Sequence, residues 1–506
     1  MKFNNKIFLL LIFIFCVSML GFWQMSNYFP DPDAFYHIKM AQLIFDQGII
    51  KDFPWQQFTI LKDNFTDHHL LYHIILIPFV ITGYPFMGAK ILTVLLTSLL
   101  IVVFSVLMMK LKLKGALWAG LLMALIAPLA FRLNLVKANS LSLIILFLGV
   151  YMALKYRYKW LAVLSFLYVW AYGGFALLIV LVGLVAVIDL IFSRKIKRNI
   201  LLIISNVGGI LAGVIINPYF PKNISFYWQQ LVQIGIVNYQ NTIGVGREWY
   251  PYGLGRLLTD CSVLTIGLLI ALILFGIYIK KQNRLSWVGF FMFIGGLVLV
   301  LKSRRYIEYY VPFSIFFILV TINASLKDWP WSDLKNKYKN FWQKNNFNKI
   351  VLVVSSVYFV GMISAILVHG FIVNNGDLKK GVNYYEFKDA MVWLANSEQH
   401  NSSRTVLHDD WDEWPQLFYF NSYNFYICGL DPTFMYKYNQ DLFWQWVDIT
   451  LGKQVDDLPN IIKNNFKAGY IFVESGHTAM DKNIQAYPED FVLIYEDNEA
   501  KIYEVK

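Results

Sequence analysis

The sequence is poor in charge and in cysteine. Only 15% of its 506 residues are Asp, Glu, Lys or Arg, whereas 57% are hydrophobic, and the mean hydropathy is +0.48. A soluble domain carries about 25% charged residues, so the composition excludes a soluble protein and predicts a polytopic membrane protein. The three cysteines, Cys16, Cys261 and Cys428, are scattered along the chain. They favour neither a disulfide framework nor a metal–thiolate site, although a single Cys261–Cys428 bridge stays open.

Eleven apolar runs are each long enough to approach a membrane span of about 15 to 20 residues. The first, about 7–25, follows two lysines and lacks a small-residue cleavage site, which favours a retained signal anchor. The others begin near Ile91, Gly115, Leu141, Trp160, Gly174, Ile200, Cys261, Leu285, Tyr309 and Ile350. We therefore expect an α-helical membrane protein of about 11 transmembrane helices.

The basic residues supply an orientation. Clusters at 110–114, 155–159, 194–198, 280–284 and 327–344 all fall on one side if the eleven runs alternate, which places the N-terminus in the cytoplasm of a plasma-membrane protein. The net charge of +11 is thereby explained by topology rather than by nucleic-acid binding. A further apolar segment, 68–83, must not cross, and we expect a re-entrant or surface helix broken near Pro78.

Three larger pieces then lie outside: a first outer loop at 28–90, a second large loop at 218–260, and a C-terminal region at 371–506. The membrane domain accordingly spans 1–370. Alternating segments at 404–408, 468–473, 491–495 and 501–505 predict strands, and 384–395 predicts a helix. Residues 371–506 are therefore expected to form a small extracytoplasmic α/β domain.

The first outer loop gathers acids and histidines. Asp31 and Pro32 form a helix start and Gly48 a helix stop, and Asp33 and His37 share one face of the intervening helix. Carboxylates and neutral imidazoles beside a membrane favour a divalent cation such as Mg²⁺ or Mn²⁺, or a general base. The candidate ligands are Asp31, Asp67, His68, His69 and His37. The alternative is that Asp31 only caps the helix.

The run Asp31-Pro-Asp-Ala-Phe-Tyr-His-Ile-Lys39, directly after a first span, resembles the Asp-Pro motif in the first loop of the oligosaccharyltransferase catalytic subunit and of GT-C membrane glycosyltransferases. The resemblance implies a GT-C fold, a lipid-phosphate-linked sugar donor, and a role for Asp31 in metal and acceptor handling. Asp33 occupies a variable position of the motif and is the second catalytic candidate.

Two departures from that family stand out. The loop Phe131-Arg-Leu-Asn-Leu-Val-Lys-Ala-Asn-Ser140 lacks the acid that the family has there, so any missing ligands would come from Thr66-Asp-His-His69. Trp411-Asp-Glu-Trp414 has only a faint similarity to the family's Trp-Trp-Asp-Tyr-Gly peptide-binding motif. Protein asparagine is accordingly not the expected acceptor.

Basic residues on the outer side are disfavoured by topology, so we expect them to be functional. Arg304 and Arg305 can hold a phosphate or pyrophosphate bidentately. Further candidates for the lipid-phosphate site are Arg132, Lys137 and Glu248, the last of these lying in a glycine-flanked loop.

The sequence thus predicts a membrane glycosyltransferase that moves a sugar from a polyprenyl-phosphate or pyrophosphate donor to a glycan, lipid or protein acceptor at the outer face. The alternatives are a non-catalytic envelope assembly protein and a polysaccharide or lipid transporter. A transporter needs ionisable residues along its membrane path, and the spans here are nearly free of them.

Overall fold

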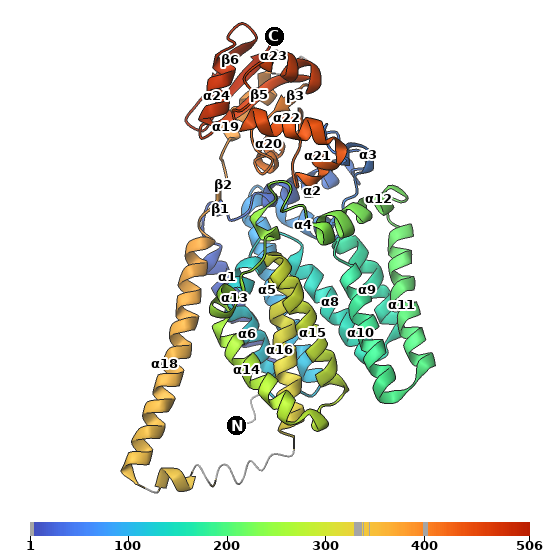
Figure 1. Cartoon of the computed structure of the whole chain (residues 1–506), viewed down its shortest axis with the longest axis vertical. Helices are drawn as coiled ribbons and strands as arrows, with labels where there is room; N and C mark the ends of the chain where they lie inside the picture. Colours follow the sequence, from blue (N-terminus) through green and yellow to red (C-terminus); the bar gives the residue numbers. More distant parts are fainter. Residues whose placement is uncertain (1–4, 328–335, 337–338, 344, 398–402) are drawn as a thin grey trace.

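The computed structural model describes residues 5–327, 336, 339–343, 345–397 and 403–506, and it has two layers (Figure 1). A bundle of upright helices forms one layer, a smaller part built around a β-sheet forms the other, and short helices lie between them. The helices of the bundle are α1 (Asn5–Trp23), α5 (Pro85–Lys110), α6 (Ala116–Leu125), α7 (Ala127–Leu133), α8 (Asn139–Leu154), α9 (Tyr158–Ala171), α10 (Ala176–Ser193), α11 (Ile196–Ile215), α13 (Leu254–Asp260), α14 (Ser262–Ile277), α15 (Arg284–Lys302), α16 (Ile307–Ser325) and α18 (Asn346–Asp377).

Within the described residues, seven helices are long and apolar enough to cross a membrane, or up to nine if each of two bent pairs counts as one span. The bent pairs are α6 with α7 and α13 with α14, and α8 and α9 are shorter apolar helices. Each of the eleven apolar runs coincides with one of these helices or pairs. That all eleven cross stays a prediction.

The break between α6 and α7 is explained by proline. Pro128 has no N–H to bond the carbonyl of Ala124, so α6 ends at Leu125 and α7 leaves at 79°. The short α7 then carries Arg132 in its last turn, buried from solvent. The bend therefore brings a charged side chain into the interior of the bundle.

The short helices between the layers are α2 (Asp33–Gln47), α3 (Leu61–Asn64), α4 (Leu70–Val80), α12 (Lys222–Trp228), the π-helix η1 (Gln229–Val237) and the 3₁₀ turns η2 (Arg247–Trp249) and η4 (Arg304–Tyr306), whereas the 3₁₀ turn η3 (Ile279–Lys281) joins α14 to α15. With 11 residues, α4 is about 16 Å long, too short to cross a hydrocarbon core of about 30 Å. The expected break near Pro78 is wrong: α4 continues through Pro78 to Val80, because a proline in the last turn removes only one hydrogen bond.

The C-terminal part contains a five-stranded sheet of order β4-β3-β5-β7-β6. Its strands are β3 (Thr405–Leu407), β4 (Phe425–Tyr426), β5 (Ala468–Glu474), β6 (Phe491–Glu496) and β7 (Ala500–Val505), and its helices are α19 (Lys388–Ser397), α20 (Trp414–Phe420), α21 (Thr433–Tyr438), α22 (Gln440–Thr450), α23 (Leu458–Asn460), α24 (Thr478–Gln485) and the π-turn η5 (Ile461–Asn465). Strands β4, β3 and β5 are parallel, whereas β7 is antiparallel to both of its neighbours. The four predicted strand segments are all present, and β4 is an addition.

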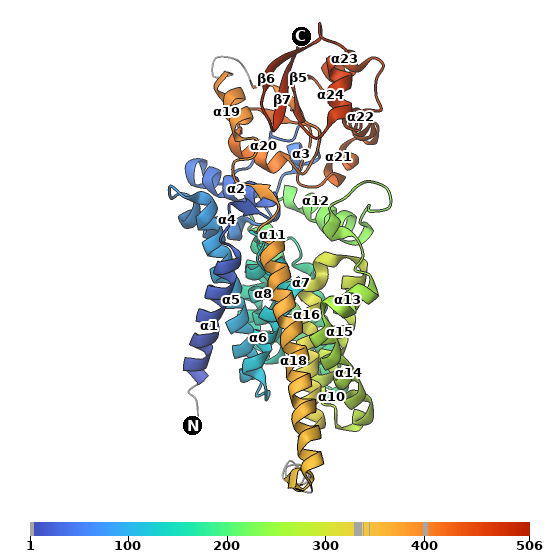
Figure 2. The same ribbon diagram turned by 90° about the vertical axis from the view of Figure 1, so that its left-hand side faces the viewer.

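Two backbone connections join the layers. Strand β1 (Tyr28–Phe29), just before Asp31, pairs antiparallel with β2 (Val382–Asn383), just after α18. The segment 55–60 of the first loop bonds to the backbone of 426–434, as in the N–H of Gln57 to the carbonyl of Tyr426 (2.8 Å). By contrast, α18 runs along the outside of the bundle (Figure 2), with only Asn348 and Asn374 buried. All three cysteines are free.

Candidate functional site

The predicted acids lie at the start of α2. Asp31 accepts a hydrogen bond through Oδ1 from the N–H of Asp33 (3.0 Å), which supports the first turn of the helix. Lys137, from the segment between α7 and α8, places Nζ 2.7 Å from Oδ2 of Asp31 and 2.8 Å from Oδ2 of Asp33. The two carboxylates therefore share one ammonium group, which the sequence alone did not pair with them.

Burial and charge set the protonation of this group. Burial raises the pKa of Asp33 to about 6, although the Lys137 ammonium opposes the shift. Burial alone would lower the pKa of Lys137, but Asp31 and Asp33 outweigh it and hold that pKa above its usual value. At neutral pH Lys137 is therefore charged, and Asp33 titrates close to neutrality, as a general base needs.

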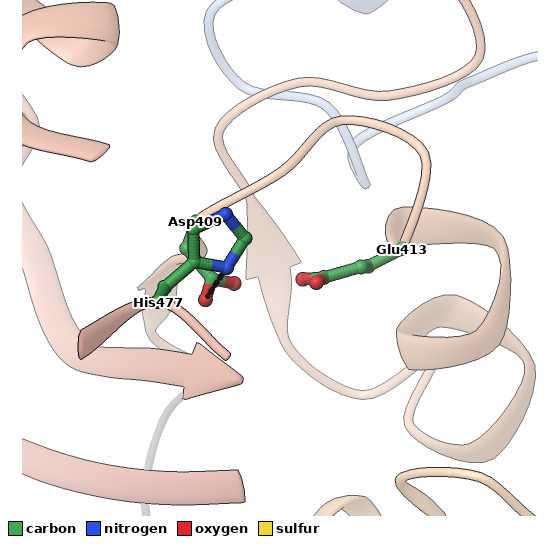
Figure 3. Close-up of side chains that lie close together, drawn as sticks. All are labelled: Asp409, Glu413 and His477. Atoms are coloured by element: carbon green, nitrogen blue, oxygen red, sulfur yellow. Dashed lines mark ion pairs between the residues drawn. The ribbon is translucent and has the colours of Figure 1, made fainter. Parts of the chain in front are cut away.

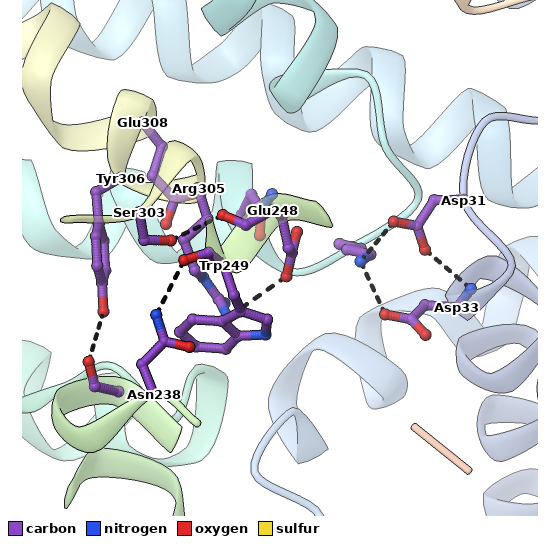
Figure 4. A network of polar contacts seen from close by, with 12 residues as sticks. Asp31, Asp33, Asn238, Glu248, Trp249, Ser303, Arg305, Tyr306 and Glu308 are labelled. Atoms are coloured by element: carbon purple, nitrogen blue, oxygen red, sulfur yellow. Dashed lines mark hydrogen bonds and ion pairs between the residues drawn. The ribbon is translucent and has the colours of Figure 1, made fainter. Parts of the chain in front are cut away.

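A second charged group surrounds Glu248 in η2. Arg132 donates through Nη1 to Oε2 of Glu248, and Arg305 places Nη1 3.5 Å from its Oε1. Figure 4 shows Glu248 beside Arg305, with Asp31 and Asp33 on the opposite side of Glu248 from Arg305. Burial would raise the pKa of Glu248, but Arg132, Lys137 and Arg305 hold it well below its usual value. Glu248 is thus a carboxylate held between two guanidinium groups.

Neighbouring side chains fix the two arginines. Nε of Arg132 lies 3.3 Å from Oε2 of Glu308, a fully buried acid in the first turn of α16. Arg305 donates to the hydroxyl of Tyr172 (3.2 Å), and its guanidinium carbon lies 4.1 Å from the centre of the Trp249 ring. Sequence reasoning gave no role to Glu308 or Tyr172, and it interpreted Trp249 as part of an aromatic belt at the membrane interface. For Glu308 the signal was present, because an acid in a membrane-spanning segment is costly and usually functional.

Two cavities meet at this network. The first, of about 120 Å³, is lined by Asp33, His68, His69 and Lys137 on one side and by Arg132, Glu248 and Arg305 on the other. The second, of about 570 Å³, is lined by Arg132, Glu248, Arg304 and Arg305, together with apolar residues of α6, α7, α14 and α18. The side chains of Arg132, Glu248 and Arg305 therefore line both a small cavity, which carries polar and apolar side chains in similar amounts, and a larger, mainly apolar one.

Four of the five predicted metal ligands lie close together: the ring centre of His69 is 5.2 Å from that of His37 and 3.9 Å from that of His68, and the N–H of His69 donates to Oδ1 of Asp67, whereas Asp31 lies apart beside Lys137. Oδ2 of Asp67 lies 2.7 Å from Nδ1 of His73, and Nε2 of His73 lies 2.8 Å from Nδ1 of His37, a buried Asp–His–His chain. His37 is buried and His68 and His69 are half-buried, and desolvation lowers the pKa values of all three, that of His68 to about 4. These imidazoles are neutral, as metal ligands must be.

Asp31 and Asp33 also fit a cation poorly here, because Lys137 Nζ already occupies the position between their carboxylates. Among the described residues, the one group of three His, Cys, Asp or Glu side chains with ligand atoms within 4.8 Å of one another is Asp409, Glu413 and His477, in the C-terminal part. The expected assignment of a cation to Asp31, Asp67, His68, His69 and His37 is therefore not supported by their geometry.

The fold is that of the GT-C membrane glycosyltransferases, as the Asp31-Pro32 resemblance implies. Solved structures with this fold include archaeal oligosaccharyltransferase AglB from Archaeoglobus fulgidus in complex with an inhibitory peptide and a dolichol-phosphate (TM-score 0.65, 10% identity, 100% of this chain and 75% of that chain). A second structure, the Archaeoglobus fulgidus oligosaccharyltransferase complex with Zn and sulfate, has a TM-score of 0.54 at 10% identity, over 98% of this chain and 73% of that chain.

ArnT from Cupriavidus metallidurans bound to undecaprenyl phosphate is similar over 98% of this chain and 97% of that chain, with a TM-score of 0.55 and 13% identity. No protein-family model matches the chain, and no curated protein matches its sequence. The likeness is therefore one of fold.

Proposed function

We propose that this chain is a membrane glycosyltransferase that moves a sugar from a polyprenyl-phosphate or polyprenyl-pyrophosphate donor to an acceptor at the outer face of the membrane. The observation that carries the proposal is that Arg132, Glu248 and Arg305 line both a small acid-bearing cavity and a larger cavity that reaches α18. AglB with dolichol-phosphate and ArnT with undecaprenyl phosphate support a donor of this kind.

The second cavity suits the donor. Five arginines line it, Arg132, Arg247, Arg256, Arg304 and Arg305, and so do apolar residues such as Ile126, Val263 and Ile366. A prenyl chain would lie along the apolar surface, while Arg305 and Arg132 hold phosphate oxygens bidentately. Arg304 lies at the rim, exposed, with Nε donating to the carbonyl of Pro251 (3.2 Å).

The first cavity suits the acceptor. Three acids line it, Asp33, Glu248 and Asp431; Glu248 is held by arginines, and Asp33 is the one paired with Lys137, whereas Asp31 contacts Lys137 from outside the residues that line the cavity. In the proposed step, Asp33 takes the proton of the acceptor hydroxyl as the acceptor oxygen attacks the anomeric carbon. The bond from that carbon to the phosphate oxygen breaks, and the phosphate leaves with the electron pair, its charge offset by Arg305 and Arg132. Asp31 and Lys137 are positioning residues that orient Asp33.

The proposal includes the topology expected from charge. Counting α8 and α9 with the nine longer helices or pairs gives eleven spans, with a cytoplasmic N-terminus and residues 371–506 outside the cell membrane. A divalent metal such as Mg²⁺ or Mn²⁺ stays part of the proposal only as an aid to phosphate departure, and no step above depends on it.

The test separates donor binding from chemistry. In detergent or nanodiscs, the wild-type chain should bind a short-chain polyprenyl phosphate, and Arg305→Gln should weaken that binding about 10- to 100-fold, because a hydrogen bond to a charged group contributes about 1.5–3 kcal/mol. Lys222→Gln removes an exposed charge at the start of α12, outside both cavities, and is the matched control.

Asp33→Asn should keep donor binding but abolish glycan or lipid-sugar product in cells, at unchanged protein level. Equal binding by all variants would contradict the donor site. A fully active Asp33→Asn variant would contradict the acceptor site, and a variant that changes only lipid movement across the bilayer would favour the transporter alternative.

A further inference from the structure

Three side chains that line neither of the cavities described above meet at one edge of the C-terminal sheet. Asp409 and Glu413 lie in the segment between β3 and α20, and His477 lies between β5 and α24. Because β3 and β5 are parallel neighbours, the segments that follow them leave the sheet at the same edge, where α/β proteins commonly bind ligands. The topology of the sheet thus brings His477 to Asp409 and Glu413, which precede it by 68 and 64 positions.

The ligand atoms converge in this arrangement. Nδ1 of His477 lies 2.8 Å from Oδ2 of Asp409, which also accepts a hydrogen bond from the N–H of Glu474 (2.6 Å). Figure 3 shows the carboxylate of Glu413 directed toward this pair from the opposite side. One donor atom of each residue lies within 4.8 Å of the others, so small side-chain movements bring all three within about 2.0–2.2 Å of a common ion.

Two of the buried oxygens have no donor. Asp409 is 3% exposed and Glu413 is 7% exposed, yet no hydrogen-bond partner among the described residues reaches Oδ1 of Asp409 or Oε2 of Glu413. Buried carboxylate oxygens are ordinarily satisfied, and leaving them unpaired costs free energy. A cation between the carboxylates would satisfy both oxygens.

We propose that Asp409, Glu413 and His477 form a binding site for a divalent cation of the Zn²⁺ type. One imidazole and two carboxylates are a donor set that suits Zn²⁺ better than Mg²⁺ or Ca²⁺, which prefer oxygen alone, and a water molecule completes four-coordination. His477 is about a third exposed, which leaves an entry path from solvent.

The ion would stabilise the segment from Asp409 to Trp414, which contacts both the first outer loop (28–90) and the second large loop (218–260). Trp411, between two of the ligands, lies against Gly246 of the loop that carries Glu248, since a Cβ at Gly246 would stand 3.6 Å from its ring. Trp414, next to Glu413, places its ring 6.0 Å from that of Tyr36, a residue that lines the first cavity. The site therefore fastens two sheet segments at the point where the C-terminal part meets the cavities.

Isothermal titration of the chelator-treated, full-length chain with Zn²⁺ alone tests the proposal. The wild type should bind one ion at this site, and Glu413→Gln and His477→Ala should each weaken that binding at least tenfold. His69→Ala removes an imidazole of the first cavity and is the matched control, which should leave the affinity unchanged. Glutamine is isosteric with glutamate and His477 is partly exposed, so both variants are expected to fold.

A thermal-shift measurement provides the second readout, because an ion that binds only the native state raises the unfolding temperature. Zn²⁺ should raise it in the wild type, a chelator should reverse the rise, and His477→Ala should abolish it. Absence of binding in the wild type, wild-type affinity in both ligand variants, or loss of binding in His69→Ala would each overturn the proposal.

Discussion

Glu248 lies at the position proposed above for the phosphate of the donor. Its two carboxylate oxygens face Arg132 and Arg305, the guanidinium groups assigned above to the phosphate. A phosphate and this carboxylate therefore compete for the same donors. We predict that Glu248→Gln binds polyprenyl phosphate more tightly than the wild type.

The magnitude follows from the two contacts. Net contributions of hydrogen bonds to charged groups are about 1.5–3 kcal/mol. The contact of Arg305 with Glu248, at 3.5 Å, is longer than a strong charge-assisted bond, and the Glu248 side chain is 27% exposed. Releasing the carboxylate should therefore cost about 1 kcal/mol, and removing its charge should tighten phosphate binding about fivefold. Arg132 keeps Glu308 as a partner in the variant.

The assay is a titration with short-chain polyprenyl phosphate, followed by tryptophan fluorescence because the Trp249 ring contacts Arg305. Asp63→Asn, which neutralises an exposed acid of the first loop, is the control and should stay within twofold of the wild type. If Glu248→Gln binds polyprenyl phosphate as tightly as the wild type or more weakly, the competition argument is refuted. If Asp63→Asn tightens binding by the same factor, the effect comes from the net charge of the protein and not from competition for Arg132 and Arg305.

Three further predictions concern stability and pH. Lys137→Met leaves Asp31 and Asp33 without their shared cation. Breaking a fully buried ion pair costs about 3–5 kcal/mol, and because these carboxylates are 23% and 31% exposed, we expect the free energy of unfolding to fall by about 2 kcal/mol. Thermal unfolding in detergent measures the loss, and adding Asp31→Asn and Asp33→Asn should largely reverse it. Burial raises the pKa of Asp33 from 3.8 to about 6, so its contribution to stability is present below pH 3.8 and is lost as the pH rises through 6. The rate of sugar transfer, which uses Asp33 as a base, should instead rise over the same pH range. Asp33→Asn should remove both pH dependences, and a wild-type stability that does not change with pH in this range would contradict the raised pKa. Asp189 is 1% exposed and pairs with Arg198 (2.5 Å) and Arg284 (3.0 Å). Asp189→Ala should therefore lower the free energy of unfolding by about 3 kcal/mol. Asp448 has no such ion pair among the described residues, and Asp448→Ala should change the free energy of unfolding by less than about 0.5 kcal/mol.

Local features were predictable from the sequence because they depend on neighbouring residues. Apolar runs located the bundle helices, and alternation located β3, β5, β6 and β7. The expected helix break at Pro78 was wrong because Pro78 lies in the last turn of α4, which ends two residues later at Val80. A proline there removes one hydrogen bond and leaves the rest of the helix intact.

The composition of the site was also partly predictable, but its pairing was not. Asp31, Asp33, Lys137, Glu248 and Arg305 were each singled out by residue type and side of the membrane. Their partners are set by packing between α2, the α7–α8 segment and η2, far apart in the chain, so no local pattern encodes them. The metal ligands show the same limit: Asp67 has His73 as a closer partner, and the group with metal-like geometry lies in a segment where only a faint motif similarity was visible.

The hydrogen bonds between the first loop and the C-terminal sheet have a practical consequence. The N–H groups of Gln57 and Phe58 donate to the carbonyls of Tyr426 and Ile427, and Tyr426 donates back to Trp55, so the first loop covers the outer edge of β4. A fragment beginning at 371 would expose that edge as a template for strand pairing with other copies, the usual route to aggregation. Soluble expression of the C-terminal part therefore calls for residues 54–60 to be supplied with it, either fused ahead of 371 or as a separate peptide that restores a monomer.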